Sequence, residues 1–99
     1  MLNYQKIPVH YMLSGMQRYV EHGIEPGSFL TAVLCNDLKG AVANADDNNI
    51  QELVEWVRFC WNELPANIWG SPEKVAAHIE ACATKRAEQA RGERDVESS

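Results

Sequence analysis

The stretch that organises this sequence runs from Pro26 to Val42 and reads PGSFLTAVLCNDLKGAV. It has the most apolar helical pattern of the chain, and we expect one helix that continues to about Ala43 or Asn44. Residues that recur three and four positions apart share one face of a helix. That face carries Leu30, Val33, Leu34, Asp37, Leu38 and Ala41.

Asn36 and Asp37 interrupt this apolar pattern. Both are poor helix formers, because their short polar side chains compete for nearby backbone groups. Asp37 falls on the face predicted to be buried, where a carboxylate needs a partner. Three roles stay open for it: recognition of a ligand in a concave site, a general base whose pKa is raised by burial, or a cap or brace for neighbouring backbone.

The other helices are predicted by the same spacing. Pro8 and Pro72 suit first helical turns, and Ser71 suits the cap before Pro72. Gly23 and Pro65 suit helix ends. A short connection between the second and third helices favours an antiparallel pair. The sequence therefore predicts a small four-helix, all-α domain with an antiparallel central pair, its helices covering approximately residues 8–21, 26–44, 50–64 and 72–90.

Length and composition set the domain organisation. The 99 residues, 45% of them hydrophobic, suffice for one domain with one core. We expect this domain to cover residues 1–90 and a disordered polar tail to cover residues 91–99. No apolar run approaches the ~20 residues that span a bilayer, and the N-terminus lacks the layout of a signal peptide. We therefore expect a cytoplasmic protein that has no membrane partner.

Charge and residue types argue against several function classes. The formal net charge is −5, with 9 basic and 14 acidic residues, so nucleic acid is not an expected partner. The histidines are scattered and no metal-binding motif is present, so no metal or other cofactor is expected. The cysteines are expected to be reduced core residues; they are Cys35, Cys60 and Cys82.

The third predicted helix holds surplus aromatic residues. Trp56 and Phe59 lie off its apolar stripe, and Trp69 falls in the loop after it. Such aromatics form either a ligand platform or partner surface, or they cover neighbouring helices inside the core. Both interpretations stay open. The stripe that we expect to be buried consists of Ile50, Leu53, Val54, Val57, Cys60, Trp61 and Leu64.

Two predicted helix starts carry a glycine followed by a serine. Gly27-Ser28 and Gly70-Ser71 would present free N–H groups and the positive end of a helix dipole, which favour phosphate or carboxylate. The alternative is ordinary helix capping.

The chain carries, in this order, Tyr19-Val20, Gly23, Pro26-Gly27-Ser28-Phe29-Leu30, Ala32-Val33-Leu34, Asn36-Asp37-Leu38, Ala45-Asp46, Asn49, Pro65 and Trp69-Gly70-Ser71. This succession resembles a family of small helical proteins found in bacteriophage and prophage genomes. The resemblance covers roughly residues 7–80 and contains no catalytic motif. It implies an accessory protein in a bacterial cytoplasm, such as an inhibitor of a host enzyme or a sponge for nucleotide-derived immune signals.

The resulting hypothesis is a non-enzymatic protein that binds or sequesters a nucleotide-like ligand in a pocket completed by self-association. Tryptophan would stack on a base, glycine-serine amides would hold phosphate, Asn36 and Asp37 would read polar edges, and arginine would balance charge. The candidate ligand-binding residues are Asn36, Asp37, Trp56, Trp69, Gly27, Ser28, Gly70, Ser71, Arg18 and Arg58.

Two alternatives compete with this hypothesis. One is an interaction module or inhibitor that docks on a host or phage protein through a patch of Trp56, Phe59 and Trp69. The other is an enzyme that uses Asp37 or a cysteine.

Overall fold

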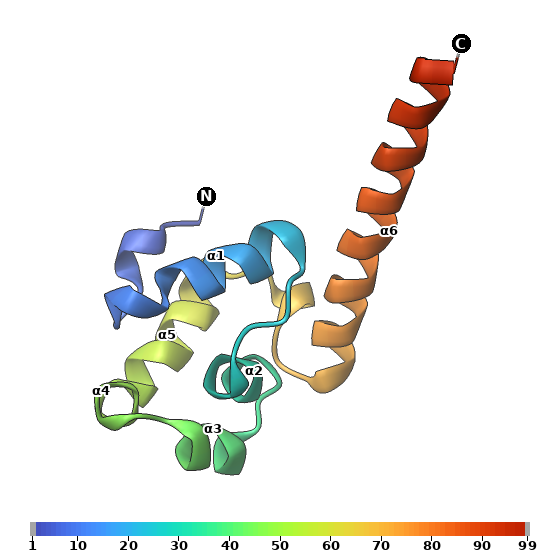
Figure 1. Cartoon of the computed structure of the whole chain (residues 1–99). Coiled ribbons are helices and arrows are strands. Elements are labelled where there is room, and N and C mark those ends of the chain that lie inside the picture. Colours follow the sequence, from blue (N-terminus) through green and yellow to red (C-terminus); the bar gives the residue numbers. More distant parts are fainter. Residues whose placement is uncertain (1, 99) are drawn as a thin grey trace.

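The computed structural model describes residues 2–98, and side chains from residue 2 to 90. Within this part every regular element is helical, so the predicted all-α class is confirmed (Figure 1). The predicted four-helix arrangement with an antiparallel central pair is not confirmed. The α-helices are α1 Leu13–His22, α2 Ser28–Leu34, α3 Leu38–Asn44, α4 Asp47–Gln51, α5 Leu53–Glu63 and α6 Pro72–Ser98, and the 3-10 helices are η1 Tyr4–Lys6, η2 His10–Met12 and η3 Ala66–Ile68.

The helix predicted over residues 26–44 is two helices, α2 and α3, separated at Asn36 and Asp37. Asn36 adopts the left-handed conformation with φ 62°. Its N–H donates to the Val33 carbonyl at 3.1 Å, and the Asp37 N–H donates to the Ala32 carbonyl at 2.8 Å. This pair of bonds is the Schellman motif that closes a helix C-terminus. The chain therefore turns where the continuous helix was expected.

Asp37 is exposed and caps α3, so the expectation that it lies on a buried face was wrong. Its Oδ1 accepts a hydrogen bond from the Gly40 N–H at 3.0 Å. An acceptor at this position satisfies one of the free N–H groups of a first helical turn. Of the roles left open for Asp37, the structure shows backbone capping.

The orientation of α5 also differs from the prediction. Trp56, Phe59 and Cys60 are buried, with exposed fractions of 0%, 3% and 0%, whereas Val54 and Trp61 are exposed at 65% and 77%. The Trp56 ring contacts Phe59 edge-on, and its Nε1–H donates to Asn49 Oδ1 at 3.0 Å. The core interpretation of Trp56 and Phe59 is therefore confirmed, and most of the predicted stripe faces outward.

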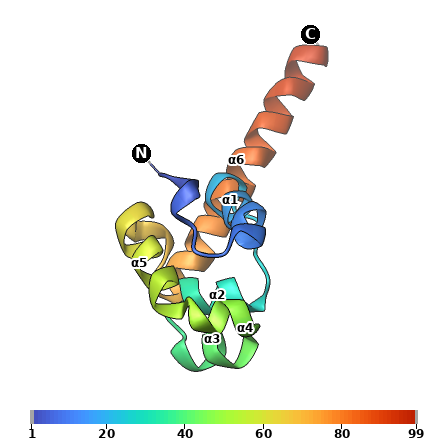
Figure 2. The ribbon, with the colours of Figure 1, turned by 90° about the vertical axis from the view of Figure 1, so that its left-hand side faces the viewer.

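The first turns of α6 pack on α1, and the rest of the helix projects away from the other helices (Figures 1 and 2). Val75 is buried, and His78 Nε2 contacts the Tyr19 carbonyl at 2.7 Å. Beyond the half-buried Cys82 every described side chain is exposed. The helix predicted to end near residue 90 continues to Ser98, through most of the predicted tail of residues 91–99. The side chains of this tail are not described, and its predicted disorder stays a prediction.

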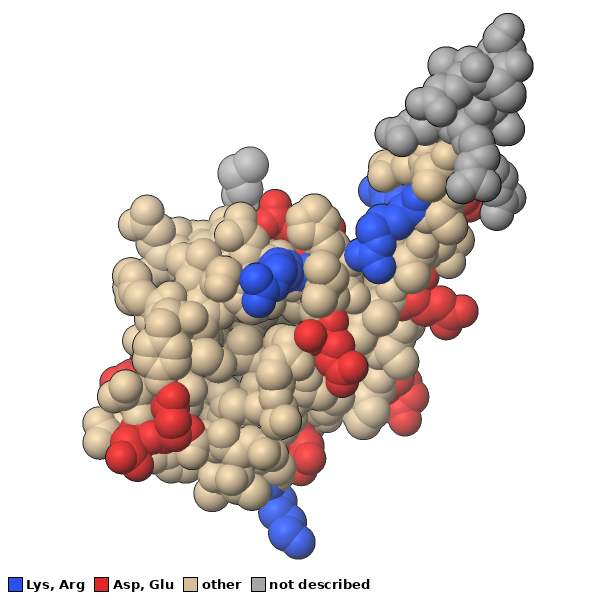
Figure 3. Space-filling view, viewed as in Figure 1, with Lys and Arg blue, Asp and Glu red and all other residues tan. Residues whose placement is uncertain are grey.

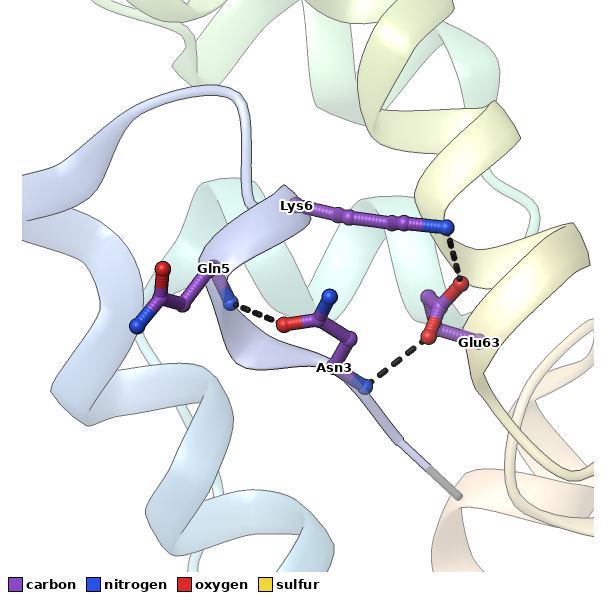
Figure 4. Close-up of polar contacts among 4 residues, drawn as sticks. All are labelled: Asn3, Gln5, Lys6 and Glu63. Atoms are coloured by element: carbon purple, nitrogen blue, oxygen red, sulfur yellow. Dashed lines mark hydrogen bonds and ion pairs between the residues drawn. The ribbon is translucent and has the colours of Figure 1, made fainter.

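Glu63, in the last turn of α5, attaches the N-terminal segment to the body (Figure 4). Its Oε1 accepts from the Asn3 N–H at 2.8 Å, and its Oε2 lies 3.5 Å from Lys6 Nζ. These contacts offset the unfavourable position of a carboxylate at a helix C-terminus, and they lower the pKa of Glu63.

Candidate binding surface

The largest exposed apolar side chains on α3 and α5 form what we call the apolar face. Val54, Val57 and Trp61 follow one another at i, i+3 and i+7, so they form one ridge along α5. Leu38 and Val42 lie one turn apart on α3. The members and their exposed fractions are Leu38 67%, Val42 49%, Val54 65%, Val57 45% and Trp61 77%.

Two hollows adjoin this face and meet at its centre. A shallow depression of about 40 Å³ lies between α3 and the start of α5, lined by Leu38 and Leu53 among others. A larger hollow of about 420 Å³, which we call the Trp groove, lies at the other end of α5 and is lined by Trp61 and Trp69. Val57 lines both, so the apolar surface is continuous along α5.

Another wall of the Trp groove is the loop after η3, which two hydrogen bonds fix in place. The Tyr19 hydroxyl donates to the Ile68 carbonyl at 2.5 Å, and the Gly70 N–H donates to the Leu34 carbonyl at 2.7 Å. Gly70 has φ 108°, a conformation that favours glycine. Trp69 between these anchors is therefore held against the end of α2.

The structure brings three predicted site residues together in the Trp groove, namely Asn36, Trp69 and Gly70. Ser71 lies beside them as the cap of α6, since its Oγ accepts from the Lys74 N–H at 3.2 Å. Capping therefore describes Ser71 better than anion binding.

Sequence reasoning missed five lining residues of this groove, among them Trp61 and Lys74. Trp61 was assigned to the buried stripe. Lys74 lies two residues after Pro72, in the first turn of α6. This position beside Gly70-Ser71 is the feature of the sequence that could have indicated it as a site residue.

The other predicted site residues lie elsewhere. Trp56 has no exposed surface for a ligand. Asp37 lines the shallow depression and a third hollow, on the α2 side, which also contains Ser28 and Glu25. Two carboxylates make this third hollow a poor site for phosphate, which argues against the Gly27-Ser28 anion site.

The two candidate arginines are not part of the Trp groove. Arg18 is exposed on α1. Arg58 is exposed on α5, where its Nη1 lies 3.2 Å from Oε1 of Glu55.

The described residues place one cysteine beside a histidine, since Cys82 Sγ lies 3.8 Å from His78 Nε2. They contain no group of three or more His, Cys, Asp or Glu side chains placed to hold a metal ion. The three cysteines are free thiols, and burial raises the pKa of Cys60 to about 12, so its reactive thiolate is suppressed. Burial also raises the pKa of Tyr19.

On the face drawn in Figure 3, basic side chains lie in separate small groups among acidic ones. A continuous basic surface of the kind that binds a nucleic-acid backbone is not seen on that face. Among the described residues, none of the helices combines the length and the apolar character required to cross a bilayer.

Comparison of this chain with protein-family models, with curated proteins and with solved structures found no match. The features of this chain that bear on its function are therefore the apolar face and the Trp groove.

Proposed function

We propose that this protein is a non-enzymatic interaction module whose apolar face docks an amphipathic helix of a protein partner. The observation that carries the proposal is the outward ridge of Val54, Val57 and Trp61 on α5. Contiguous exposed apolar patches mark interaction sites on soluble proteins, and tryptophan is among the residues that contribute most to binding.

The shape of the surface supports a helical partner. An amphipathic helix places apolar anchors at i, i+3, i+4 and i+7 into a hydrophobic groove. The continuous surface from the shallow depression through Val57 to the Trp groove provides pockets in a row along α5. This surface differs from the predicted docking patch of Trp56, Phe59 and Trp69. Of these three residues only Trp69 lines it, because Trp56 and Phe59 are buried.

A display library of amphipathic helices, selected on the purified protein, tests this function. We expect enriched sequences that bind the wild type and the Asn62→Glu variant but not Trp61→Glu. Asn62 is exposed next to Trp61 on α5 and off the ridge, so it is the matched control. Selected helices that bind Trp61→Glu as well as the wild type would contradict the proposal.

A second candidate function is the capture of a nucleotide-like ligand in the Trp groove. It is favoured by one observation: Asn36, Gly70 and Lys74 bring polar groups to a groove lined by two indoles. A volume of about 420 Å³ lies within the range of small-molecule sites. Trp69 would stack on a base and Lys74 would neutralise a phosphate.

Isothermal titration with cyclic and linear nucleotides tests the second candidate. We expect binding that is lost in Trp69→Ala and weakened in Lys74→Ala. Absence of heat across the panel, together with absence of a co-purified nucleotide, would exclude it.

The phage resemblance supports a setting for either function. In a bacterial cytoplasm, the partner would be a host or phage protein, and sequestration of a nucleotide signal would serve counter-defence. Expression in bacteria, followed by quantitative comparison of proteins retained by wild type and Trp61→Glu, tests this setting.

A further inference from the structure

We infer that the apolar face pairs with a second copy of this chain, with the two α5 helices antiparallel across a twofold axis near Val57. This inference rests on the proposed function and names the partner helix as α5 itself. A twofold interface brings the same patch of both copies together, so the patch must be complementary to itself. Both its shape and its charges meet this requirement.

The shape is complementary because a protrusion and a hollow lie at opposite ends of the ridge. Trp61 stands out at one end, exposed at 77%. The shallow depression lies at the other end, beside Leu38 and Leu53. An antiparallel arrangement about Val57 places Trp61 of each copy against Val54 of the other and beside the shallow depression, so that a large side chain meets a small one.

The charges are complementary in the same arrangement. Asp37 lines the depression and Lys74 lines the Trp groove, two hollows that share Val57. Both are exposed. Within the described part of the chain the ion pairs are Lys6–Glu63 and Arg58–Glu55, so neither Asp37 nor Lys74 is paired there. A twofold axis near Val57 brings Asp37 of each copy toward Lys74 of the other.

Pairing also changes the Trp groove. Because Trp61 and Val57 line both the groove and the interface, the second copy covers part of the groove opening. The pocket completed by self-association that the sequence suggested would be formed in this way.

Sedimentation equilibrium from micromolar to millimolar protein concentration tests the pairing. We expect the wild type and Asn62→Glu to reach twice the monomer mass. Trp61→Glu and Val54→Glu should each lower the association constant about thirtyfold or more, the loss typical of an interface hot spot. Both substitutions are at exposed positions, and circular dichroism checks that the variants remain helical.

A charge-reversal series tests the antiparallel arrangement. Lys74→Glu should weaken association about fivefold at low ionic strength, because it places a glutamate toward Asp37 of the second copy. Asp37→Asn added to Lys74→Glu should recover about half of this loss, because it removes the new repulsion but does not restore the attraction. Asparagine still caps α3, so the fold is not affected. Equal association of Lys74→Glu and the wild type would overturn the arrangement.

Failure of the inference can be distinguished from failure of the proposed function. A wild type that stays monomeric at millimolar concentration, or a dimer that Trp61→Glu does not weaken, overturns pairing through this face. In either case, helices from the display library that depend on Trp61 would still support the interaction module.

Discussion

Gly23, at the end of α1, lies directly against Cys82 of α6. A β-carbon built on Gly23 would be 2.5 Å from the Cys82 β-carbon and 3.3 Å from the His78 carbonyl oxygen. Gly23 also has φ 64°, the left-handed conformation in which glycine is favoured. Only glycine therefore allows α6 to approach α1 this closely.

Gly23→Ala should lower the free energy of unfolding by about 2–4 kcal/mol, because left-handed strain and a steric clash add together. Gly15→Ala is the matched control in the same helix. Its β-carbon would lie 3.8 Å from Leu30 Cδ1, an ordinary contact, and alanine should stabilise the helix by up to about 1 kcal/mol. Urea unfolding measures both; equal stabilities of the two variants would show that α6 does not pack as described.

Asp37→Ala should destabilise the protein by about 1 kcal/mol, because the first turn of α3 loses the acceptor for its Gly40 N–H. Asp37→Asn should be near wild type, since asparagine caps as well as aspartate. Thermal unfolding of the two variants distinguishes the cap from a charge effect. An Asp37→Asn variant as unstable as Asp37→Ala would mean that the charge, and not the cap, matters.

Asn49→Ala should cost about 1–3 kcal/mol, because it leaves the buried Trp56 N–H without its acceptor. Trp56→Phe removes the donor, so the additional effect of Asn49→Ala in that background should be smaller. A double-mutant cycle in urea measures this coupling. Strictly additive effects would show that the hydrogen bond does not contribute to stability.

The free energy of unfolding should fall at acidic pH because Glu63 becomes protonated. The Asn3 N–H bond and the Lys6 charge lower its pKa in the folded state. Its contribution is therefore fully present above the pKa of an unfolded glutamate, about 4.3, and is lost as pH falls through the lower folded value. The stability difference between the wild type and Glu63→Gln should shrink over this window. A stability difference that does not change with pH would show that the Glu63 carboxylate does not hold the N-terminal segment.

The break between α2 and α3 shows what local chemistry can reveal. Asn36 and Asp37 are residue types that are unsuited to a helix interior, and backbone capping is one of the roles that the sequence leaves open for Asp37. Helical periodicity nevertheless continues across them in the sequence and places Leu38 on the buried face, whereas Leu38 is exposed at 67% in the structure. The left-handed conformation of Asn36 depends on backbone bonds to Val33 and Ala32 that periodicity does not show.

The face that α5 buries was decided by tertiary packing. Apolar residues occupy more than half of its circumference, so more than one orientation buries a large apolar area. The observed orientation seals Trp56 between Phe29 and Phe59 and satisfies its N–H through Asn49. In this orientation Val54 and Trp61 are exposed. The spacing of apolar residues along one helix could not indicate this, because it does not show which face packs on the other helices.

By itself, the sequence determined the helical class, the end of α1 at Gly23 and the start of α6 at Ser71-Pro72, because periodicity and capping act within a few residues. Only the tertiary structure decided that Asp37 is an exposed cap, that Trp56 is buried, and that Trp61 and Trp69 line one groove. These outcomes depend on which helices compete for the same core space, and that competition involves residues far apart in the chain.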